Sequence, residues 1–412
     1  MKNKITIIGI NFYPEDTSTG LYTTQLAEYL ANYYEVDVIT GFPYYPQWQI
    51  KESYKNKPKY IKEKLGNINI YRYKQYVPQN PTFKKRVLHL LSFTLGSIPN
   101  IFKVNKSDLV ICVVPPTGSI ILGWLLSKIK RAKLWIHIQD FEFDAAFEAG
   151  LVNNQNMFKY KIFEGLFWME KKLLDSADIV STISYKMLEK LKTKTKTETY
   201  YLPNWIDENF INPVKAKPHR YMQSDKFKIL YSGNIGEKQD WEFFLKVIEF
   251  FRDYNDIEFI VVGDGARKNW LVERIKNYNY KNVKYYPPVS YTELSDLLCS
   301  ADLHILFQKI DVIDTVMPSK ILGMMASAKP SLVTGNEKSE VANIINESKG
   351  GAFFKSGDLE SVLNFIKMIN NNYKLIEEYG KNARNYVIKY FSKDKVFKNL
   401  REKIITLIEK DG

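Results

Sequence analysis

The sequence contains few of the residues that build metal sites, disulfide frameworks or membrane spans. Of its 412 residues, two are cysteine and four are histidine. Cys112 and Cys299 lie far apart in the chain, so we expect two reduced, buried thiols of a cytoplasmic protein rather than a metal pair or a disulfide. No apolar run reaches the about 18 residues of a membrane-spanning helix. The nearest, residues 87–102, is interrupted by His89 and Pro99.

Several well-known binding signatures are also missing. The segment VVGDGARKNW (261–270) would need a third glycine at position 268 to complete a dinucleotide fingerprint, but Lys268 stands there. The GxxxxGK[ST] string of P-loop proteins is absent. No recognition-helix or RNA-binding signature is present either, so a nucleic-acid partner is not expected. These absences disfavour a dehydrogenase, a P-loop nucleotidase and a nucleic-acid-binding protein.

Positive charge, in contrast, is abundant. The formal net charge is +13, and residues 51–86 alone contain eleven Lys or Arg against two Glu. Aromatic residues are interleaved with this charge: Tyr54, Tyr60, Tyr71, Tyr73, Tyr76 and Phe83. Two interpretations remain open for this segment. It is either a solvated, lysine-rich surface or a face that lies on an anionic membrane surface.

The pattern of apolar residues predicts an α/β protein with two doubly wound domains. Apolar residues make up 45% and charged residues 25% of the chain, as in globular proteins. Ile- and Val-rich strands alternate with amphipathic helices, and this pattern starts again near residue 227. Residues 202–226 contain three prolines and no clear period, which is typical of a linker. We predict domains at 1–205 and 222–389, with a final helix at about 390–412 packing back on the first domain.

The expected elements can be stated as ranges. The predicted strands are 4–10, 35–40, 108–114, 133–139 and 177–184 in the first half and 227–234, 257–264, 282–289, 301–308 and 330–335 in the second. The predicted helices include 21–33, 117–130 and 157–174 and a final helical region over 386–410. Such folds bind ligands beyond the carboxyl ends of their strands, so the candidate site residues are those that follow strands.

In the first half, polar residues follow two of the predicted strands. Gly20 stands at the entrance to the first helix, where it would let backbone amides approach a phosphate or sugar. Glu15, in the same loop, either binds hydroxyl groups or caps the helix start. Asp140 opens the acid-rich segment DFEFDAAFEAG and would face a ligand. His137 lies inside the preceding strand, where it is either a core histidine or part of a catalytic pocket.

In the second half, two basic segments suggest anion sites. In LYSGNIGEKQDW, Gly233 and Gly236 bracket a tight turn and Lys238 lies where the next helix begins. In TVMPSKILGMMASAKP (315–330), Pro318 predicts a helix start, and Ser319 and Lys320 follow with no acidic residue before Pro330. Two such sites fit a diphosphate better than a single phosphate. The PPV segment (287–289) could offer backbone groups to a nucleobase.

Together these segments resemble the retaining, GT-B-fold glycosyltransferases of family 4, within them the subgroup of colanic-acid, capsule and O-antigen sugar transferases. The resemblance runs from NFYPEDTSTG through IQDFEFDAAFEAGL and YLPNWIDENF to YSGNIGEKQDW, VVGDG, PPV and MPSKILGMMASAKP. It implies two Rossmann-like domains that face each other across a cleft. It also implies a retaining, metal-independent hexosyl- or N-acetylhexosaminyltransferase that needs no cofactor, because the nucleotide sugar is a substrate.

The resemblance also implies partners and residue roles. The donor would be a UDP- or GDP-sugar, and the acceptor a lipid-diphosphate-linked polysaccharide at the inner face of the cell membrane, with which the protein would be peripherally associated. The departing phosphate oxygen would take the acceptor proton. The implied catalytic residues are Asp140, Lys238 and Lys320; the donor-binding residues are Gly233, Asn234, Gly263, Pro288, Val289, Asp314, Pro318 and Ser319; and the acceptor-side residues are Glu15, Gly20 and His137.

The sequence departs from the family pattern at three positions. Many relatives have two glutamates where this chain has Thr315 and Gly323, and Asp314 is the candidate to replace the first. Many also have an arginine four residues before the phosphate-binding lysine, where this chain has Asn234. The missing glutamates leave open a non-catalytic member of a polysaccharide-assembly complex. A second alternative is a GT-B-fold sugar-nucleotide epimerase or hydrolase.

Overall fold

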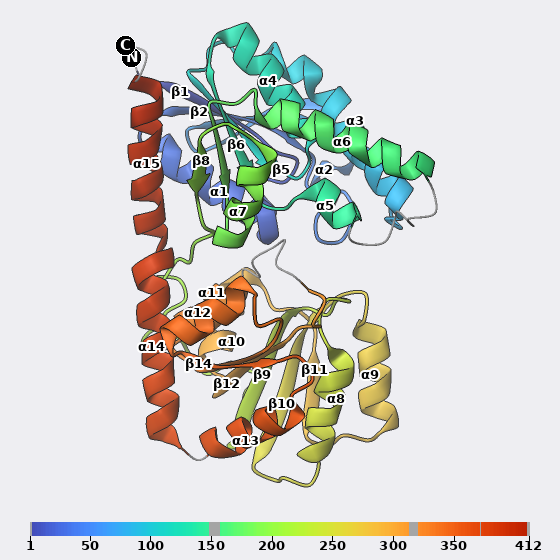
Figure 1. Cartoon of the computed structure of the whole chain (residues 1–412), viewed down its shortest axis with the longest axis vertical. Helices are drawn as coiled ribbons and strands as arrows, with labels where there is room; N and C mark the ends of the chain where they lie inside the picture. The colour runs from blue at the N-terminus through green and yellow to red at the C-terminus, as the bar shows by residue number, and fades with distance from the viewer. Residues whose placement is uncertain (1, 148–156, 313–319, 371, 410–412) are drawn as a thin grey trace. The chain divides into compact units, whose positions relative to one another are not determined.

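The computed structural model describes residues 2–147, 157–312, 320–370 and 372–409. The chain forms two compact units, which are described separately below. The first comprises Met1–Pro203 together with Phe397–Gly412, and the second comprises Asn204–Val396. Each unit contains one largely parallel sheet covered by helices (Figure 1).

The sheet of the first unit has the strand order β3-β4-β2-β1-β5-β6-β7-β8. All neighbouring strands are parallel except β3 and β4, which form an antiparallel pair at one edge. The strands are β1 (Lys4–Ile8), β2 (Glu35–Gly41), β3 (Tyr60–Leu65), β4 (Ile68–Tyr73), β5 (Leu109–Val114), β6 (Lys133–Ile138), β7 (Ile179–Thr182) and β8 (Thr199–Tyr201). Strand β5 is buried along its whole length, as the continuous apolar run LVICVV requires.

Helices connect these strands as a doubly wound sheet requires. They are α1 (Ser18–Ala31), α2 (Glu52–Lys55), α3 (Phe83–Ile101), α4 (Gly118–Lys130), α5 (Glu142–Ala146), α6 (Met157–Leu174) and α7 (Tyr185–Lys194). The last helix, α15 (Lys393–Glu409), contributes to this unit from Phe397 onward. Phe397 stacks on Tyr29 of α1 with ring centroids 4.6 Å apart, and the Arg401 guanidinium lies 4.0 Å from the Tyr33 ring centroid.

The basic and aromatic segment 51–86 is neither wholly a solvated surface nor wholly a membrane-facing surface, the two interpretations drawn from its sequence. Its centre forms the β3–β4 hairpin, which the sequence analysis did not predict. Tyr54, Tyr71 and Tyr73 are buried, so the expectation that these aromatic side chains lie on a surface is wrong. Arg72 is fully buried and pairs with Glu63 of the adjacent strand. These residues stabilise the edge of the sheet, while Tyr76 and Phe83 remain exposed.

The sheet of the second unit has the order β11-β10-β9-β12-β13-β14, and all its neighbours are parallel. This is the 3-2-1-4-5-6 order of a Rossmann sheet. The strands are β9 (Phe227–Asn234), β10 (Ile257–Asp264), β11 (Val283–Tyr286), β12 (Leu303–Phe307), β13 (Ser331–Gly335) and β14 (Gly351–Lys355). The order reverses between β9 and β12, and the loops that follow these two strands define the point where such sheets bind ligands.

The helices of the second unit cover both faces of its sheet (Figure 1). They are α8 (Trp241–Phe250), α9 (Lys268–Asn277), α10 (Leu294–Cys299), α11 (Lys320–Ala326), α12 (Glu340–Ser348), α13 (Leu359–Ile369) and α14 (Tyr373–Phe391). The predicted final helical region over 386–410 is divided between α14 and α15 at Ser392, whose side chain donates a hydrogen bond to Glu208 (2.6 Å). Most of the segment expected to be a linker, from Asn204 onward, belongs to this unit, where Arg384 binds the carbonyls of Glu208 and Ile211.

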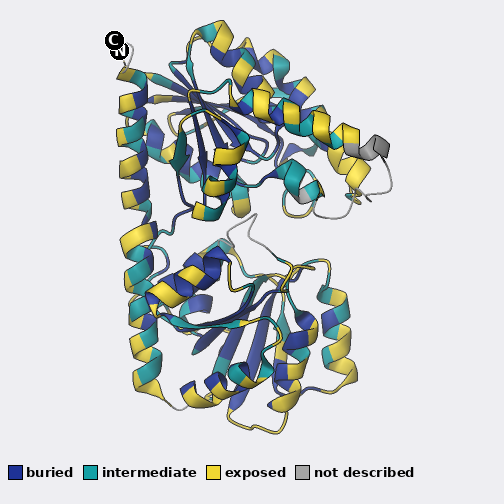
Figure 2. Cartoon of the chain, in the orientation of Figure 1, coloured by how far each residue is buried: buried dark blue, intermediate teal, exposed yellow. Residues whose placement is uncertain are grey.

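The strands of both sheets form the cores of the two units (Figure 2). Strand β10 is buried from Ile257 to Gly263, and β12 and β13 are buried throughout. Cys112 is buried in β5, whereas Cys299 is partly exposed, and neither forms a disulfide. Burial on both sides of the strands leaves the loops at their carboxyl ends to carry polar chemistry.

Candidate functional site

The loops that follow β9 and β12 are joined at the switch point of the second sheet. Gln239 and Gln308 form an isolated antiparallel bridge. The Lys309 amide donates to the Lys238 carbonyl (3.1 Å), and the Asp240 amide donates to the Phe307 carbonyl (2.9 Å). These bonds fix the β9–α8 loop against the end of β12, so Lys238 is held at the edge of the sheet where Rossmann folds bind ligands.

Lys320 reaches the same edge from α11. Its Nζ donates a hydrogen bond to the Tyr231 hydroxyl (2.8 Å) and lies 4.5 Å from the centroid of that ring. The Tyr231 hydroxyl in turn donates to the Asn234 carbonyl (2.5 Å) at the end of β9. Burial lowers the pKa of Lys320 to about 7. The amine is therefore poised to gain a proton when an anion comes close to it.

The Lys320 amine lies in a space that is open because Gly233 and Gly263 have no side chains. Gly233 has a φ of +133°, and a Cβ atom there would lie 3.1 Å from Lys320 Nζ. A Cβ atom on Gly263 would lie 1.9 Å from the Gly233 carbonyl oxygen. Larger residues at either position would shift the end of β9 or displace the amine. Gly233 and Gly263 thus shape the space around Lys320.

Lys238 has a different environment from Lys320. Its side chain is exposed, and within the described ranges it forms no salt bridge. The loop around it is nevertheless ordered, because the Gly236 amide donates to Gln239 (3.1 Å) and the Trp241 indole donates to the Gly236 carbonyl (3.0 Å). Asp240 caps α8 by accepting from the Phe243 amide (3.0 Å). A fixed backbone therefore presents a lysine side chain that can turn toward a ligand.

The remaining donor-side predictions are only partly within the described structure. Pro288 and Asn234 are exposed and Val289 is partly exposed, and all three follow or end strands of this sheet. The Tyr285 hydroxyl donates to the Gly263 carbonyl (3.0 Å), which ties the end of β11 to β10. The predicted residues Asp314, Pro318 and Ser319 lie outside the described residues, as does Thr315.

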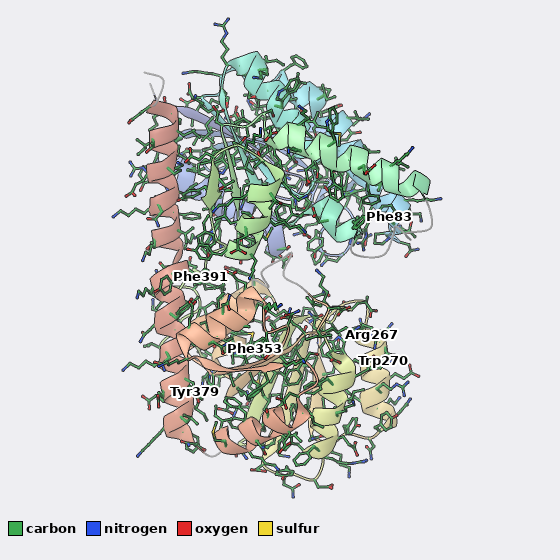
Figure 3. The ribbon with its side chains drawn as sticks, viewed as in Figure 1. Phe83, Arg267, Trp270, Phe353, Tyr379 and Phe391 are labelled. Atoms are coloured by element: carbon green, nitrogen blue, oxygen red, sulfur yellow. The ribbon has the colours of Figure 1, made fainter. Side chains whose placement is uncertain are left out.

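Arg267 is a further cation at this sheet edge, and the sequence analysis did not select it. It precedes α9, and its amide donates to the Ile235 carbonyl (2.9 Å). Its guanidinium lies 4.0 Å from the centroid of the Trp270 ring (Figure 3). The guanidinium also pairs with Glu242. In the segment VVGDGARKNW the recognisable pattern is the glycine spacing, and that pattern gives no weight to the arginine. Because Glu242 balances its charge, Arg267 contributes less positive potential than Lys238.

In the first unit, Glu15 joins two loops. It is buried and accepts hydrogen bonds from the amides of Tyr44 (2.8 Å) and Tyr45 (2.9 Å) and from the Asn11 side chain (2.8 Å). Burial raises the pKa of Glu15, against the opposing effect of these bonds. Glu15 does not cap α1, whose N-cap is Thr17. It instead holds together the loops that follow β1 and β2.

Gly20 is in contact with Glu15. A Cβ atom on Gly20 would lie 2.8 Å from Glu15 Cβ, so the glycine allows α1 to approach the buried carboxylate side chain. The close packing against Glu15 explains why a residue without a side chain fits at position 20. The acceptor-side role of Gly20 stays a prediction.

His137 lies inside the first sheet. It is 2% exposed, and its ring nitrogens lie 2.9 Å from the Ser181 hydroxyl and 2.9 Å from the Gln139 side-chain nitrogen. The Trp135 indole donates to the same Ser181 oxygen (2.7 Å). Burial lowers the pKa of His137 to about 4, so the ring is neutral near pH 7. Of the two interpretations of His137, this geometry supports the core histidine.

Asp140 follows β6 directly and is partly exposed. The next acidic residue, Glu142, accepts from the Thr117 amide (2.7 Å) and hydroxyl (2.9 Å), which ties this segment to the loop after β5. Burial raises the pKa of Glu142. Asp144 forms salt bridges with Lys190 (2.8 Å) and Lys194 (2.7 Å). Glu142 and Asp144 therefore have structural partners that position Asp140 at the carboxyl end of β6.

Comparison with known proteins identifies the family. Residues 216–386 match the family described as Glycosyl transferases group 1. Over 406 residues the chain is 33% identical to WcaI of Escherichia coli K12, assigned to colanic acid biosynthesis as a glycosyl transferase; the match covers 96% of this chain and 98% of WcaI. The chain belongs to the group 1 glycosyltransferases. This glycosyltransferase is also 21% identical over 280 residues to WbjE of Pseudomonas aeruginosa, covering 66% of this chain and 68% of WbjE.

Solved structures confirm the predicted GT-B fold of this glycosyltransferase. Sucrose-phosphate synthase of Thermosynechococcus elongatus matches with a TM-score of 0.74 at 16% identity, covering 98% of this chain and 99% of that one. HepE of Anabaena, solved in complex with UDP, matches with a TM-score of 0.67 at 12% identity, covering 98% and 100%. WaaG, a glycosyltransferase of lipopolysaccharide biosynthesis, matches with a TM-score of 0.65 at 14% identity, covering 98% and 100%.

Proposed function

We propose that this glycosyltransferase transfers a hexosyl or N-acetylhexosaminyl group, with retention, from a UDP- or GDP-sugar to a lipid-diphosphate-linked surface polysaccharide. The observation that carries the proposal is the contact of Lys320 Nζ with Tyr231, beside Gly233 and at the switch point that also holds Lys238. Among the described residues no carboxylate pairs with the Lys320 amine, and a buried amine in this state is suited to an anionic ligand. A nucleotide diphosphate is the anion that a glycosyltransferase donor supplies.

Lys238 and Lys320 would both bind the diphosphate of the donor, and they differ in burial. The residue Lys320 is partly exposed, but its amine is buried, has a lowered pKa and would gain its charge as the donor binds. The Lys238 side chain, in contrast, is exposed. Each charge placed against the leaving diphosphate in a water-poor site lowers the barrier by about 2–4 kcal/mol. Ser319 would add a hydroxyl to the same phosphates. Gly263, Pro288 and Val289 would line the nucleoside side of the donor.

The chemical step needs no strong base from the protein. The bond between the anomeric carbon and the β-phosphate oxygen breaks, and the acceptor oxygen bonds to the same face of that carbon. The departing phosphate oxygen takes the acceptor proton. Asp140 would orient a sugar hydroxyl or stabilise the positive charge that develops on the sugar. The reaction as proposed uses neither a metal ion nor another cofactor.

The acceptor is proposed from the relatives and from the charge of the chain. WcaI is assigned to colanic acid biosynthesis and WaaG to lipopolysaccharide biosynthesis, and both products are carbohydrates of the cell surface. A net charge of +13 suits an enzyme that works at an anionic inner-leaflet surface. Glu15, Gly20 and His137 would contribute to the acceptor side by shaping the first unit rather than by direct proton transfer.

A donor panel tests this function. Thermal unfolding of the purified protein is followed with UDP-, GDP- and ADP-sugars, and turnover is then measured with and without a lipid-linked acceptor. We expect one UDP- or GDP-sugar to raise the unfolding temperature and to be consumed only when acceptor is present. Consumption without acceptor would point to an epimerase or hydrolase. Binding without any turnover would point to a non-catalytic member of an assembly complex.

A further inference from the structure

Helix α3 of the first unit has an unusual outward face. Its inward side is buried through Phe93, Ser97 and Ile101. Its outward side carries a second apolar stripe at helical spacing, made of Val87, Leu88, Leu91 and Leu95, all exposed. Leu95 and the following Phe102 are both 65% exposed. A helix that is apolar on both sides is normally buried, so the outward stripe of α3 calls for a partner.

The two neighbouring helices extend this apolar surface. Helix α4 packs against both α3 and α6. Its outward side exposes Ile121, Trp124 and Ile129. Helix α6 exposes Ile162 and Trp168, and Trp168 is 65% exposed. We call the outward residues of α3, α4 and α6 the three-helix face.

The charges on the three-helix face have one dominant sign. Helix α3 begins with Phe83, which Figure 3 labels, followed by the exposed Lys84, Lys85 and Arg86, and it contains no acidic residue. Helix α4 also contains no acidic residue and ends with basic ones. Helix α6 exposes basic residues and Glu164, while its other acid, Glu170, is buried and paired with Lys194 (2.7 Å). Basic residues thus lie beside exposed leucines and tryptophans.

We propose that the three-helix face is a docking surface for an anionic lipid bilayer, into whose headgroup region the outward side chains of α3, α4 and α6 insert. The inference rests on the proposed function only in that a lipid-linked acceptor lies in a membrane. Exposed apolar side chains that gather on three neighbouring helices mark an interaction surface. The combination of Leu, Trp and Lys on helices is that of interfacial membrane binding.

The three-helix face differs from the other exposed apolar residues of the described structure. Exposed apolar side chains of the second unit, such as Val214, Phe250 and Tyr373, lie on separate elements. The basic segment 51–86 contributes the start of α3, but its buried Tyr54, Tyr71 and Tyr73 cannot insert into lipid. Among the described helices, none is both long and apolar enough to cross a bilayer.

Vesicle flotation of the full-length protein tests the face. Vesicles of phosphatidylglycerol with phosphatidylcholine are compared with vesicles of phosphatidylcholine alone. The test variant is Leu91→Glu with Leu95→Glu, and the matched control is Val214→Glu with Tyr373→Glu on the second unit. We expect the test variant to bind anionic vesicles at least tenfold more weakly than the wild type and the control to bind normally. A third variant, Lys84→Glu with Lys85→Glu, should weaken binding most at low salt.

Each outcome of this experiment has a defined meaning. Equal flotation of the Leu91/Leu95 variant and the wild type would overturn the proposal, as would equal binding of the wild type to both vesicle types. Sedimentation without lipid shows whether a second copy of the chain covers the three-helix face instead. The membrane proposal would also be overturned if the wild type is a dimer, the Leu91/Leu95 variant is a monomer and both float equally. Calorimetry of the wild-type protein with the nucleotide-sugar donor, in the absence of lipid, separates the two proposals. If the wild type does not bind the donor, the proposed function is contradicted and the membrane-docking proposal is not.

Discussion

The amine of Lys320 lies 2.8 Å from the hydroxyl oxygen of Tyr231, although 89 residues separate them in the chain. The pair brings a cation from α11 to the end of β9, and Tyr231 is itself held by its bond to the Asn234 carbonyl (2.5 Å). Burial keeps the pKa of the Lys320 amine near 7. The charge of the Lys320 amine is therefore expected to affect both donor binding and sugar transfer.

Replacing either lysine of the proposed diphosphate site is expected to lower turnover. Lys320→Ala and Lys238→Ala should each reduce sugar transfer at least tenfold, because the leaving diphosphate loses one stabilising charge. Steady-state transfer assays measure the effect. Lys276→Ala, which removes an exposed lysine of α9, is the matched control and should retain full activity. Near-normal turnover in either site variant, with its fold intact, would show that the lysine has no part in the reaction.

Donor binding is expected to weaken as the pH rises above about 7. Below this pH the Lys320 amine is already protonated in the free protein, so this group adds no pH dependence there. Above it, binding a diphosphate must first restore the proton, and affinity should fall up to tenfold per pH unit. Calorimetry at about pH 8 in buffers of different ionisation enthalpy should detect uptake of close to one proton. Lys320→Arg, whose charge is permanent, should bind without this uptake. Equal proton uptake by both proteins would exclude Lys320 as its source.

Tyr231 is expected to act as a positioning residue for Lys320. In Tyr231→Phe the amine loses its hydrogen-bond acceptor and the Asn234 carbonyl loses a donor. We expect donor affinity to fall about threefold to tenfold and unfolding free energy to fall by about 1 kcal/mol. Calorimetric titration and urea unfolding measure the two effects, with Tyr373→Phe on an exposed site as the control. A variant that is less stable but binds donor normally would leave Tyr231 with a structural role only.

Asp140 is expected to serve the reacting sugar and not the nucleotide. Asp140→Asn keeps the side-chain shape and removes the charge, so transfer should be abolished while nucleotide binding persists. Activity assays and calorimetry with UDP or GDP separate these two effects. Asp178→Asn, directly before β7 in the same unit, is the comparison for a general effect of removing an acid. Loss of nucleotide binding in Asp140→Asn would contradict the assigned role.

Much of the fold could be predicted from the sequence because parallel strands buried on both sides have nearly continuous apolar runs. The helix predicted at 157–174 coincides with α6, and strands such as β5 and β10 lie within their predicted ranges. The β3–β4 hairpin was missed because β3 is an edge strand whose exposed lysines, Lys62 and Lys64, made the segment read as a charged surface. Predicted strand 282–289 ends early at Tyr286, since Pro287 has no amide to donate.

The site could be predicted only as separate segments. The order of strand, glycine turn and helix start predicts Lys238, and the helix start at Pro318 with no acidic residue after it predicts Lys320. Their common location depends on the strand order, in which β9 lies beside β12, and no local pattern encodes that order. Tyr231 was missed for the same reason, since its partner comes from α11. The sequence predicts Gly20 as a ligand-binding loop glycine and Glu15 as a hydroxyl-binding or helix-capping residue. The packing contact between them is a relationship that spacing alone does not show.

A crystal structure with a bound nucleoside diphosphate is the most direct test of the central claim. We predict diphosphate oxygens within hydrogen-bonding distance of Lys320 Nζ, with Lys238 turned toward the same phosphates at the carboxyl ends of β9 and β12. A nucleotide bound with its phosphates remote from both lysines would contradict the account.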